Sequence, residues 1–249
     1  MVEPGTALLI DIGNSRVKWG WASRSRIEPG EPFATSASLD EFPRRWAGLP
    51  APAQVVAANV AGAGIGDSLK AFTEQRWGLA PRFVHSQAQA FGISNGYTNP
   101  EKLGVDRWLA LIGARQAGTG PWCVADCGTA ITVDALDAEG RHLGGLIAPG
   151  LALMRAALAR GTHALPLAGT DAEVGLARDT AAAIANGARQ AAAGLVERAF
   201  RDTARRLGVA PRLLLTGGDA PVIGADLEIS HDIKPQLVLE GLYVIAQGN

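Results

Sequence analysis

The chain has 249 residues, of which 47% are hydrophobic and 19% charged, and this composition supports a packed core and excludes an intrinsically disordered chain. Its formal net charge of −1 provides no basic surface of the kind that binds nucleic acid. No apolar run approaches the roughly 20 residues of a membrane span, and the N-terminus lacks a signal-type segment, so we expect no nucleic-acid partner, no membrane association and a cytoplasmic location.

The first recognisable element is the stretch ALLIDIGNSRVKWGW at residues 7–21. An apolar run ends in Asp11, a glycine turn follows, and apolar and polar residues then alternate, which predicts two antiparallel strands joined by a tight turn. Gly13 lets a ligand approach the backbone, and Lys18 can reach a phosphate group. An ordinary Asx-type hairpin turn is the alternative explanation of this stretch alone.

The next elements alternate between helix and strand, which indicates an α/β domain. Leu39–Trp46 has helical spacing with Ser38 as its expected N-cap, and Gln54–Val60 has the composition of a buried strand. Gly62–Gly66 resembles part of a dinucleotide-binding fingerprint, but no acid follows at the spacing needed for a ribose. We therefore expect a flexible connector there and a helix over Asp67–Trp77.

Apolar residues recur with helical spacing from Val105 to Ile112, directly after Gly104. This pattern places Asp106 and Arg107 in the first turn of a helix, where the helix dipole favours anions. Two interpretations stay open: an acid that complements the dipole beside a solvated arginine, or an acid that acts as a general base in a phosphotransferase.

The stretch WCVADCGTAITVDAL at residues 122–136 repeats the first motif: an apolar run, Asp126, a glycine turn and an alternating strand. A third glycine turn follows an apolar strand at Leu213–Asp219. Cys123 and Cys127 lie four residues apart on one predicted strand, roughly 13 Å at about 3.3 Å per residue. That separation is too long for a disulfide, so we interpret both as small core residues.

Ala177–Leu207 is rich in alanine and predicts one or two long helices, ended by Gly208. Its small residues suit close contact either between subunits or within one subunit, and the sequence does not decide between the two. Leu237–Ala246 predicts a final short apolar helix.

Two such hairpins, one in each half, followed by a strand and a Gly-Gly turn, resemble the layout of the actin and sugar-kinase superfamily. The resemblance implies an α/β fold with two ribonuclease-H-like domains and a nucleotide cleft between them. We expect the N-terminal domain at residues 1–117, with the first hairpin and the catalytic acid. The C-terminal domain is expected at residues 118–249, with the second hairpin, the adenosine turn and the dimer helices.

Longer motifs make the resemblance more specific. They are DIGNSRVK at 11–18, YTNPEKLGVDR at 97–107, DCGTAIT at 126–132, GGLIAPG at 144–150, RDT at 178–180 and TGGDA at 216–220. With these motifs the chain closely resembles type III pantothenate kinases, a family that includes proteins first described as Bvg accessory factors. The resemblance implies ATP-dependent phosphorylation of the primary hydroxyl of pantothenate to 4'-phosphopantothenate, the first step of coenzyme A synthesis.

The resemblance also implies a role for each matching residue. Asp106 would be the proton acceptor, and Asp11 would hold Mg²⁺ through water. Asp126 would bind a monovalent cation such as K⁺ or NH₄⁺, and Thr129 would contact ATP. Thr180 would reach pantothenate from the partner subunit, which implies a homodimer with a shared active site. The ATP phosphates would lie on Asp11, Ile12, Gly13, Asn14, Ser15, Arg16, Val17 and Lys18, and pantothenate on Tyr97, Gly104, Val105, Asp106 and Arg107.

Departures from the family pattern are small: Ser15 stands where threonine is common, and Cys127 occupies the second hairpin. The alternatives are another small-molecule kinase of the superfamily and a non-catalytic nucleotide-binding or regulatory relative. A sugar kinase should carry its catalytic acid in a sequence other than G-V-D-R. A catalytically inactive relative should have lost Asp11, Asp106 or Asp126, and all three are present here. The sequence has no G-x-x-x-x-G-K-[ST] motif, which argues against a P-loop kinase.

Overall fold

A computed structural model describes residues 6–23, 26–162 and 175–248. Contacts between Cα atoms divide the chain into two compact units, Met1–Gly118 with Gln236–Asn249, and Thr119–Pro235. The end of the chain therefore differs from the expected domain layout, in which the second domain ran to residue 249. The reason is packing: α7 (Leu237–Gln247) lies against α3 (Val105–Gln116) and β1 (Ala7–Ile12) of the first unit, so its apolar side chains complete the core of that unit.

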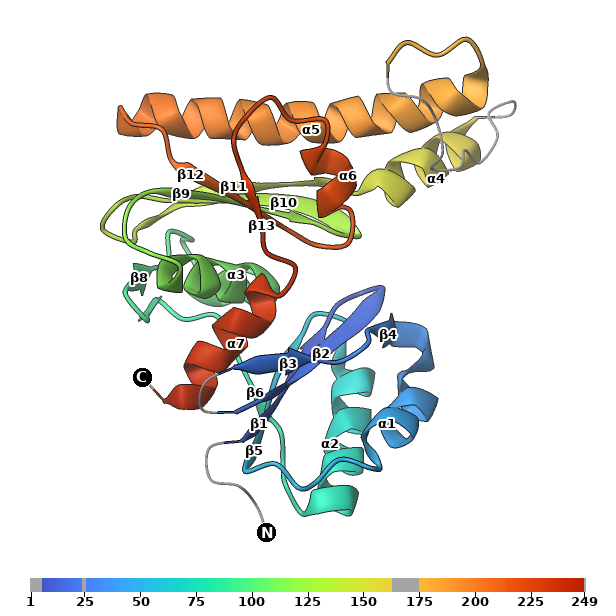
Figure 1. Cartoon of the computed structure of the whole chain (residues 1–249), viewed down its shortest axis with the longest axis vertical. Helices are drawn as coiled ribbons and strands as arrows, with labels where there is room; N and C mark the ends of the chain where they lie inside the picture. Colours follow the sequence, from blue (N-terminus) through green and yellow to red (C-terminus); the bar gives the residue numbers. More distant parts are fainter. Residues whose placement is uncertain (1–5, 24–25, 163–174, 249) are drawn as a thin grey trace. The chain divides into compact units, whose positions relative to one another are not determined.

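The sheet of the first unit has the strand order β3-β2-β1-β5-β6, with β4 beside β2 (Figure 1). β1 runs antiparallel to β2 and parallel to β5. The strand bounds are β1 Ala7–Ile12, β2 Arg16–Ala22, β3 Ile27–Pro29, β4 Phe33–Ala34, β5 Gln54–Asn59 and β6 Arg82–Phe83.

Helices cover both faces of this sheet. α1 (Ser38–Trp46) and α2 (Ala63–Trp77) enclose an aromatic core in which Trp46 stacks on Phe42 with ring centroids 4.9 Å apart. α7 contacts β1 and β5, and α3 contacts β5. Short elements between them are the 3₁₀ turns η1 (Thr35–Ala37) and η2 (Pro100–Lys102) and the small hairpin of β7 (Gln89–Ala90) and β8 (Ile93–Ser94).

Two local predictions for this unit are wrong. Ser38 is the first helical residue rather than the N-cap, and its hydroxyl donates to the carbonyl oxygen of Thr35 at 2.6 Å. The expected connector Gly62–Gly66 is already helical from Ala63 onward. Small residues allow this early start, because a Cβ at Gly66 would lie 2.9 Å from Nδ2 of Asn59.

The sheet of the second unit repeats the order of the first, β11-β10-β9-β12-β13, with β9 antiparallel to β10 and parallel to β12; its strands are labelled in Figure 1. The predicted repeat of the strand–turn–strand motif is therefore confirmed as a repeat of sheet topology. The bounds are β9 Trp122–Cys127, β10 Ala130–Leu136, β11 His142–Pro149, β12 Arg212–Thr216 and β13 Asp232–Ile233.

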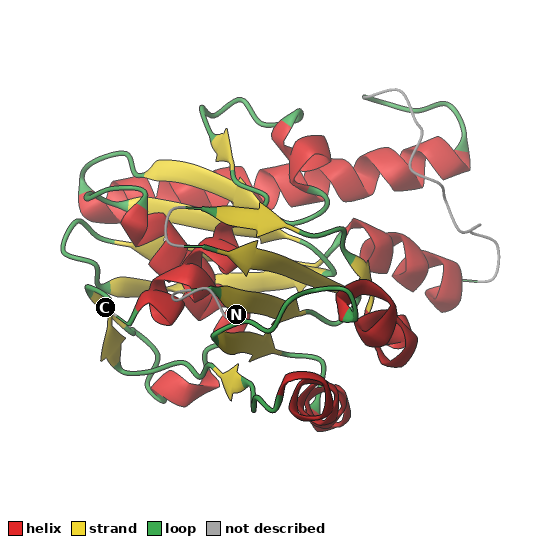
Figure 2. Ribbon diagram, turned by 60° about the horizontal axis from the view of Figure 1, so that its bottom comes forward, coloured by secondary structure: helices red, strands yellow, loops and turns green. Residues whose placement is uncertain are grey.

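The alanine-rich stretch forms one helix, α5 (Thr180–Leu207), along one face of the second sheet (Figures 1 and 2). Ala192 and Ala193 on α5 are buried, so part of its small-residue surface serves packing within the unit. α4 (Leu151–Gly161) and α6 (Ala220–Gly224) complete the unit. In the described parts of the chain, no helix combines the length and the apolarity needed to cross a membrane.

Candidate active site

The first hairpin is closed at its tip by three hydrogen bonds. The backbone N–H of Gly13 donates to the carbonyl oxygen of Arg16 at 3.1 Å. Thr35 donates its hydroxyl to the carbonyl oxygen of Gly13 at 2.7 Å and its backbone N–H to that of Ser15 at 3.0 Å. Thr35 therefore supports the turn from outside the hairpin, and no local pattern indicates this role because the residue lies about 20 positions further along the chain.

Strand alternation decides which side chains of the hairpin can meet a ligand. Ile12 and Val17 point into the core that α1 and α2 cover, so they can contact a phosphate only through their backbone. Asp11 lies on the opposite face, is 7% exposed, and has Lys18 directly across the ladder. A carboxylate and an ammonium therefore share one face of the strand pair.

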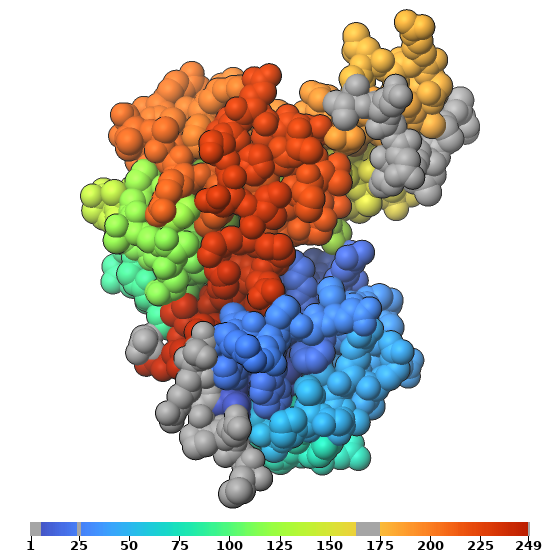
Figure 3. Space-filling view, in the orientation of Figure 1, coloured from blue at the N-terminus to red at the C-terminus, as the bar shows by residue number. Residues whose placement is uncertain are grey.

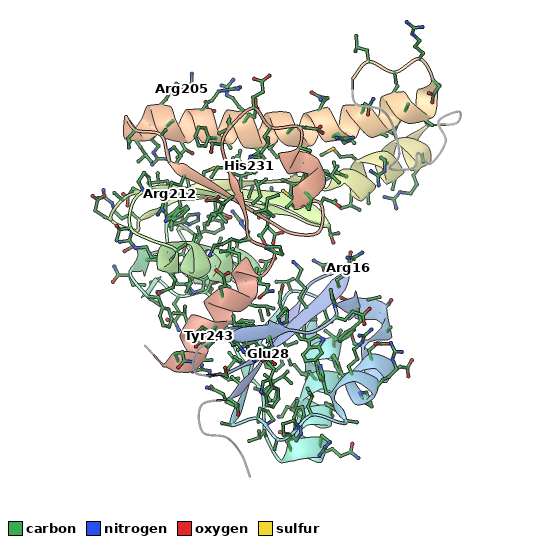
Figure 4. The ribbon with its side chains drawn as sticks, viewed as in Figure 1. Arg16, Glu28, Arg205, Arg212, His231 and Tyr243 are labelled. Atoms are coloured by element: carbon green, nitrogen blue, oxygen red, sulfur yellow. The ribbon has the colours of Figure 1, made fainter. Side chains whose placement is uncertain are left out.

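The turn itself presents exposed polar groups. Asn14, Ser15 and Arg16 are all exposed, and the tip of the hairpin reaches the surface of its unit (Figure 3). Arg16 stands at the end of the hairpin, beyond the body of the sheet (Figure 4). An accessible turn flanked by Asp11 and Lys18 fits a magnesium–triphosphate group, since magnesium takes few carboxylates and shares phosphate oxygens and water.

The predicted catalytic acid lies where the sequence placed it, in the first turn of α3. Its Oδ1 accepts a hydrogen bond from the backbone N–H of Arg107 at 2.8 Å, and the N–H of Trp108 donates to the carbonyl oxygen of Gly104 at 3.0 Å. A Cβ at Gly104 would lie 2.6 Å from Oδ1 of Asp106, so only glycine leaves the carboxylate in this position. Val105 begins the helix and is partly exposed.

One interpretation of the sequence expected a solvated Arg107, and the structure shows instead that this side chain is buried. It is 5% exposed, donates from Nη1 to the hydroxyl of Tyr97 at 2.6 Å, and places its guanidinium 5.5 Å from the centre of the Tyr97 ring. Asn95 positions Tyr97 by accepting from its N–H at 3.0 Å while donating to the carbonyl oxygen of Pro100 at 3.1 Å. The first unit thus brings together Tyr97, Asp106 and Arg107 as the sequence predicted, and adds Asn95, which the sequence did not indicate.

In the second unit the second hairpin and the late glycine turn are joined. The N–H of Asp219 donates to the carbonyl oxygen of Cys127 at 2.9 Å. Gly217 has φ +93°, and a Cβ there would lie 2.3 Å from the Cys127 carbonyl oxygen and 2.5 Å from Oδ1 of Asp126. The glycine turn therefore passes directly over the Asp126 carboxylate, while Thr129 is exposed at the tip of the hairpin.

The two cysteines are free and buried, which confirms that they are core residues. Burial, and then the carboxylates of Asp126 and Asp219, raises the pKa of the Cys127 thiol from 9.0 to about 12. Burial, and then Asp134, raises the pKa of Cys123 to about 12 as well. Cys127 faces the core under α5, so it points away from the face that carries Asp126.

Thr180 is the first residue of α5, directly after an N-cap aspartate, Asp179, whose side chain accepts from the N–H of Ala182 at 2.9 Å. It is exposed and lines a largely apolar cavity of about 840 Å³ between α4 and α5. Across the described residues, no three His, Cys, Asp or Glu side chains converge as a metal-binding group.

Comparison with known proteins assigns this set of motifs to a family. The family model described as type III pantothenate kinase matches residues 7–202. The chain belongs to the type III pantothenate kinase family. A type III pantothenate kinase from Burkholderia multivorans is 43% identical over 99% of this chain and 97% of its own length.

Two solved structures share the fold of this pantothenate kinase family member at low sequence identity. A conserved Baf-family protein from Campylobacter jejuni has a TM-score of 0.61 and 20% identity, over 96% of this chain and 97% of that chain. A glucokinase from an Antarctic psychrotroph has a TM-score of 0.50 and 12% identity, over 99% of this chain and 100% of that chain. These likenesses show the fold alone, and they confirm the predicted sugar-kinase architecture with a sheet in each of two domains.

Proposed function

We propose that this chain transfers the γ-phosphoryl group of ATP to the primary hydroxyl of pantothenate, giving 4'-phosphopantothenate and ADP. The observation that carries the proposal is the cluster at the start of α3, where the Asp106 carboxylate stands beside the buried Arg107, which is hydrogen-bonded to the half-buried Tyr97. Family membership supplies the substrate, and the cluster supplies the acid that the reaction needs.

In this proposal Asp106 accepts the proton of the attacking hydroxyl while the oxygen–phosphorus bond forms and ADP leaves. Phosphoryl transfer depends mainly on positioning and charge neutralisation, so a base of this kind contributes chiefly by removing the proton at the right moment. Arg107 is held by Tyr97 in a fixed orientation, which suits binding of the pantothenate carboxylate or its polar oxygens. Gly104 and Val105 provide the backbone beside the substrate.

The first hairpin provides the phosphate contacts. Asp11 would hold Mg²⁺ through water, and the ion would neutralise the charge that develops between the β- and γ-phosphates. Lys18, opposite Asp11, adds a fixed positive charge, and the backbone of Ile12–Val17 with the side chains of Asn14 and Ser15 offers hydrogen bonds. Thr129 of the second hairpin would contact ATP.

Two finer assignments belong to the same proposal. Asp126 would bind a monovalent cation, K⁺ or NH₄⁺, which would supply positive charge at the second hairpin. Thr180 enters the pantothenate site of a partner subunit, so the working enzyme is a homodimer. The exposure of Thr180 beside an apolar cavity supports this second assignment. The cytoplasmic location expected from the sequence stays a prediction.

A substrate panel tests the proposal. Purified protein with Mg·ATP should release ADP in proportion to added pantothenate and should form a product one phosphate heavier by mass spectrometry. Glucose, glucosamine and N-acetylmannosamine, run as matched acceptors, should give rates no higher than without an acceptor. A rate with any of these sugars equal to that with pantothenate, or no transfer to pantothenate at all, would contradict the proposal.

A further inference from the structure

A row of oxygen-bearing side chains crosses three neighbouring strands of the second sheet. Asp126 on β9 has Thr132 as its antiparallel partner on β10 and Thr216 as its parallel partner on β12. Residues paired in this way project from the same face of a sheet with Cβ atoms about 4.5–5.5 Å apart in the antiparallel case. The three side chains therefore stand side by side at the carboxyl ends of β9 and β12.

The alternation of the strands fixes which face this is. The neighbours Ala125, Cys127, Ile131 and Leu215 all belong to the core that α5 covers. The row of Thr132, Asp126 and Thr216 consequently points away from α5.

Thr216 carries an observation that packing does not explain. Its side chain is 0% exposed, and its Oγ1 has no hydrogen-bond partner among the residues that the structure describes. A buried hydroxyl without a partner costs about 1–3 kcal/mol, so such a group is usually satisfied by a water or an ion. Valine has the same shape and would avoid this cost, so the hydroxyl of Thr216 points to a ligand rather than to packing.

The first unit has a different arrangement at the equivalent place. There Asp11 has Lys18 as its antiparallel partner and Ala58 as its parallel partner. An ammonium group is thus built into the first hairpin, whereas the second hairpin has a hydroxyl at each of the two corresponding positions. At these two paired positions the second hairpin therefore offers neutral oxygen atoms, whereas the first offers the positive charge of Lys18.

We infer that the hydroxyls of Thr216 and Thr132, together with the Asp126 carboxylate, are the protein ligands of a K⁺- or NH₄⁺-sized monovalent cation. This inference rests on the proposed function, from which it takes only the cation at Asp126. One carboxylate with neutral oxygens suits a weakly hydrated monovalent ion, and the same oxygens accept hydrogen bonds from ammonium. Asp219, whose backbone N–H donates to the carbonyl oxygen of Cys127, adds a second negative charge near the end of β9.

Thermal unfolding tests the ligand set without relying on turnover. Melting curves are recorded with Mg·AMP-PNP over a series of KCl concentrations, with choline chloride holding the ionic strength constant. The parent protein should gain stability with KCl, since an ion that binds only the folded state raises the melting temperature. Thr216→Val should need at least about tenfold more KCl for the same gain, because a ligand to a charge is lost, while its melting temperature in choline chloride stays equal or rises.

Thr216→Ser is the matched control, because it keeps the hydroxyl, and it should respond to KCl like the parent. Thr132→Val should shift the KCl response in the same direction as Thr216→Val. A KCl response of Thr216→Val within about twofold of the parent would overturn the inference. If Thr216→Val lost the same amount of stability in choline chloride and in KCl, the inference would also be overturned, because the hydroxyl would then stabilise the fold without binding the cation.

Asp126→Asn separates this failure from failure of the proposed function. If the parent does not respond to KCl at all, the cation assignment itself is wrong. If KCl raises the melting temperature of the parent but not that of Asp126→Asn, a cation at Asp126 is established. A parent-like response of Thr216→Val to KCl would then reject only the two threonine ligands.

Discussion

At the scale of single residues, the position of Asp106 determines which substitution is diagnostic. Asp106→Asn keeps the size and the hydrogen bond to the backbone N–H of Arg107 but cannot accept the hydroxyl proton. We expect kcat to fall by about 10²–10⁴-fold, the usual contribution of a general base. The affinity for Mg·ATP, measured by calorimetry, should stay within about threefold of the parent, because the proposed role of Asp106 is at the pantothenate hydroxyl. A kcat close to that of the parent would leave the acid only its role in the helix dipole.

The buried thiols give a prediction that depends on pH. With folded pKa values of about 12, Cys123 and Cys127 stay protonated at neutral pH, so a thiol reagent at pH 8 should modify them only after unfolding. Because both folded values exceed the ordinary value of 9.0, the corresponding stability is fully present below about pH 9 and is lost as pH rises toward 12. Thiol titration with and without denaturant measures the first effect, and fast labelling of the folded protein would contradict it.

The sequence could predict the positions of Asp11, Asp126 and Asp106 because each lies in a local pattern: an apolar strand before a D-x-G turn, or the first turn of an amphipathic helix. It could not single out Thr35, Asn95 or Thr216. Their importance comes from contacts or strand pairings with residues remote in sequence, and a single threonine or asparagine has no local signature. The burial of Arg107 escaped prediction for the same reason, since its hydroxyl partner is ten residues away.

At the scale of elements, the first hairpin owes its shape to a residue outside it. Thr35→Val removes the hydroxyl that bonds to the carbonyl oxygen of Gly13 but keeps the backbone bond to Ser15. Losing one such bond costs about 0.5–1.5 kcal/mol, so the KM for ATP should rise by about two- to tenfold. Steady-state kinetics should show the KM for pantothenate unchanged, and Thr35→Ser should behave like the parent. An unchanged KM for ATP in Thr35→Val would mean that the hairpin holds its shape without the brace.

The contact between α3 and α7 is equally specific. A Cβ at Gly241 would lie 2.2 Å from the carbonyl oxygen of Leu109, so Gly241→Ala must push α7 away from the helix that carries Asp106. Overpacking of this kind costs about 1–3 kcal/mol, which should lower the melting temperature by several degrees.

Gly194→Ala on α5 is the control, since nothing lies within 4 Å of the added Cβ, and it should be neutral or stabilising by up to about 1 kcal/mol. Calorimetry of both variants tests the pair. Equal melting temperatures for the two variants would show that α7 can move without loss.

Elements with strong periodicity, such as α3 and the two hairpins, could be predicted within a residue or two. The start of α2 and the unit to which α7 belongs could not. Glycine-rich segments carry no intrinsic preference for helix, so the start of α2 depends on the space beside Asn59. The partner of an apolar helix is decided by packing rather than by its own sequence.

At the scale of the whole molecule, the proposed dimer gives a complementation test. Asp106→Asn and Thr180→Ala should each be inactive alone. After subunit exchange, roughly half of the dimers are mixed and each has one intact site, so about a quarter of the parent activity should return. Size-exclusion chromatography checks the dimer, and no recovery after demonstrated exchange would place Thr180 outside a shared site.

The return of α7 to the first unit also sets an order on synthesis. Residues 119–235 must all be made before α7 can emerge, which takes roughly 6–23 s at about 5–20 residues per second. During that interval the face of α3 around Leu109 and Gly113 lacks the helix that covers it. The core of the first unit therefore stays incomplete, with an apolar helix face open to chaperones and proteases, until the last helix of the chain has been made.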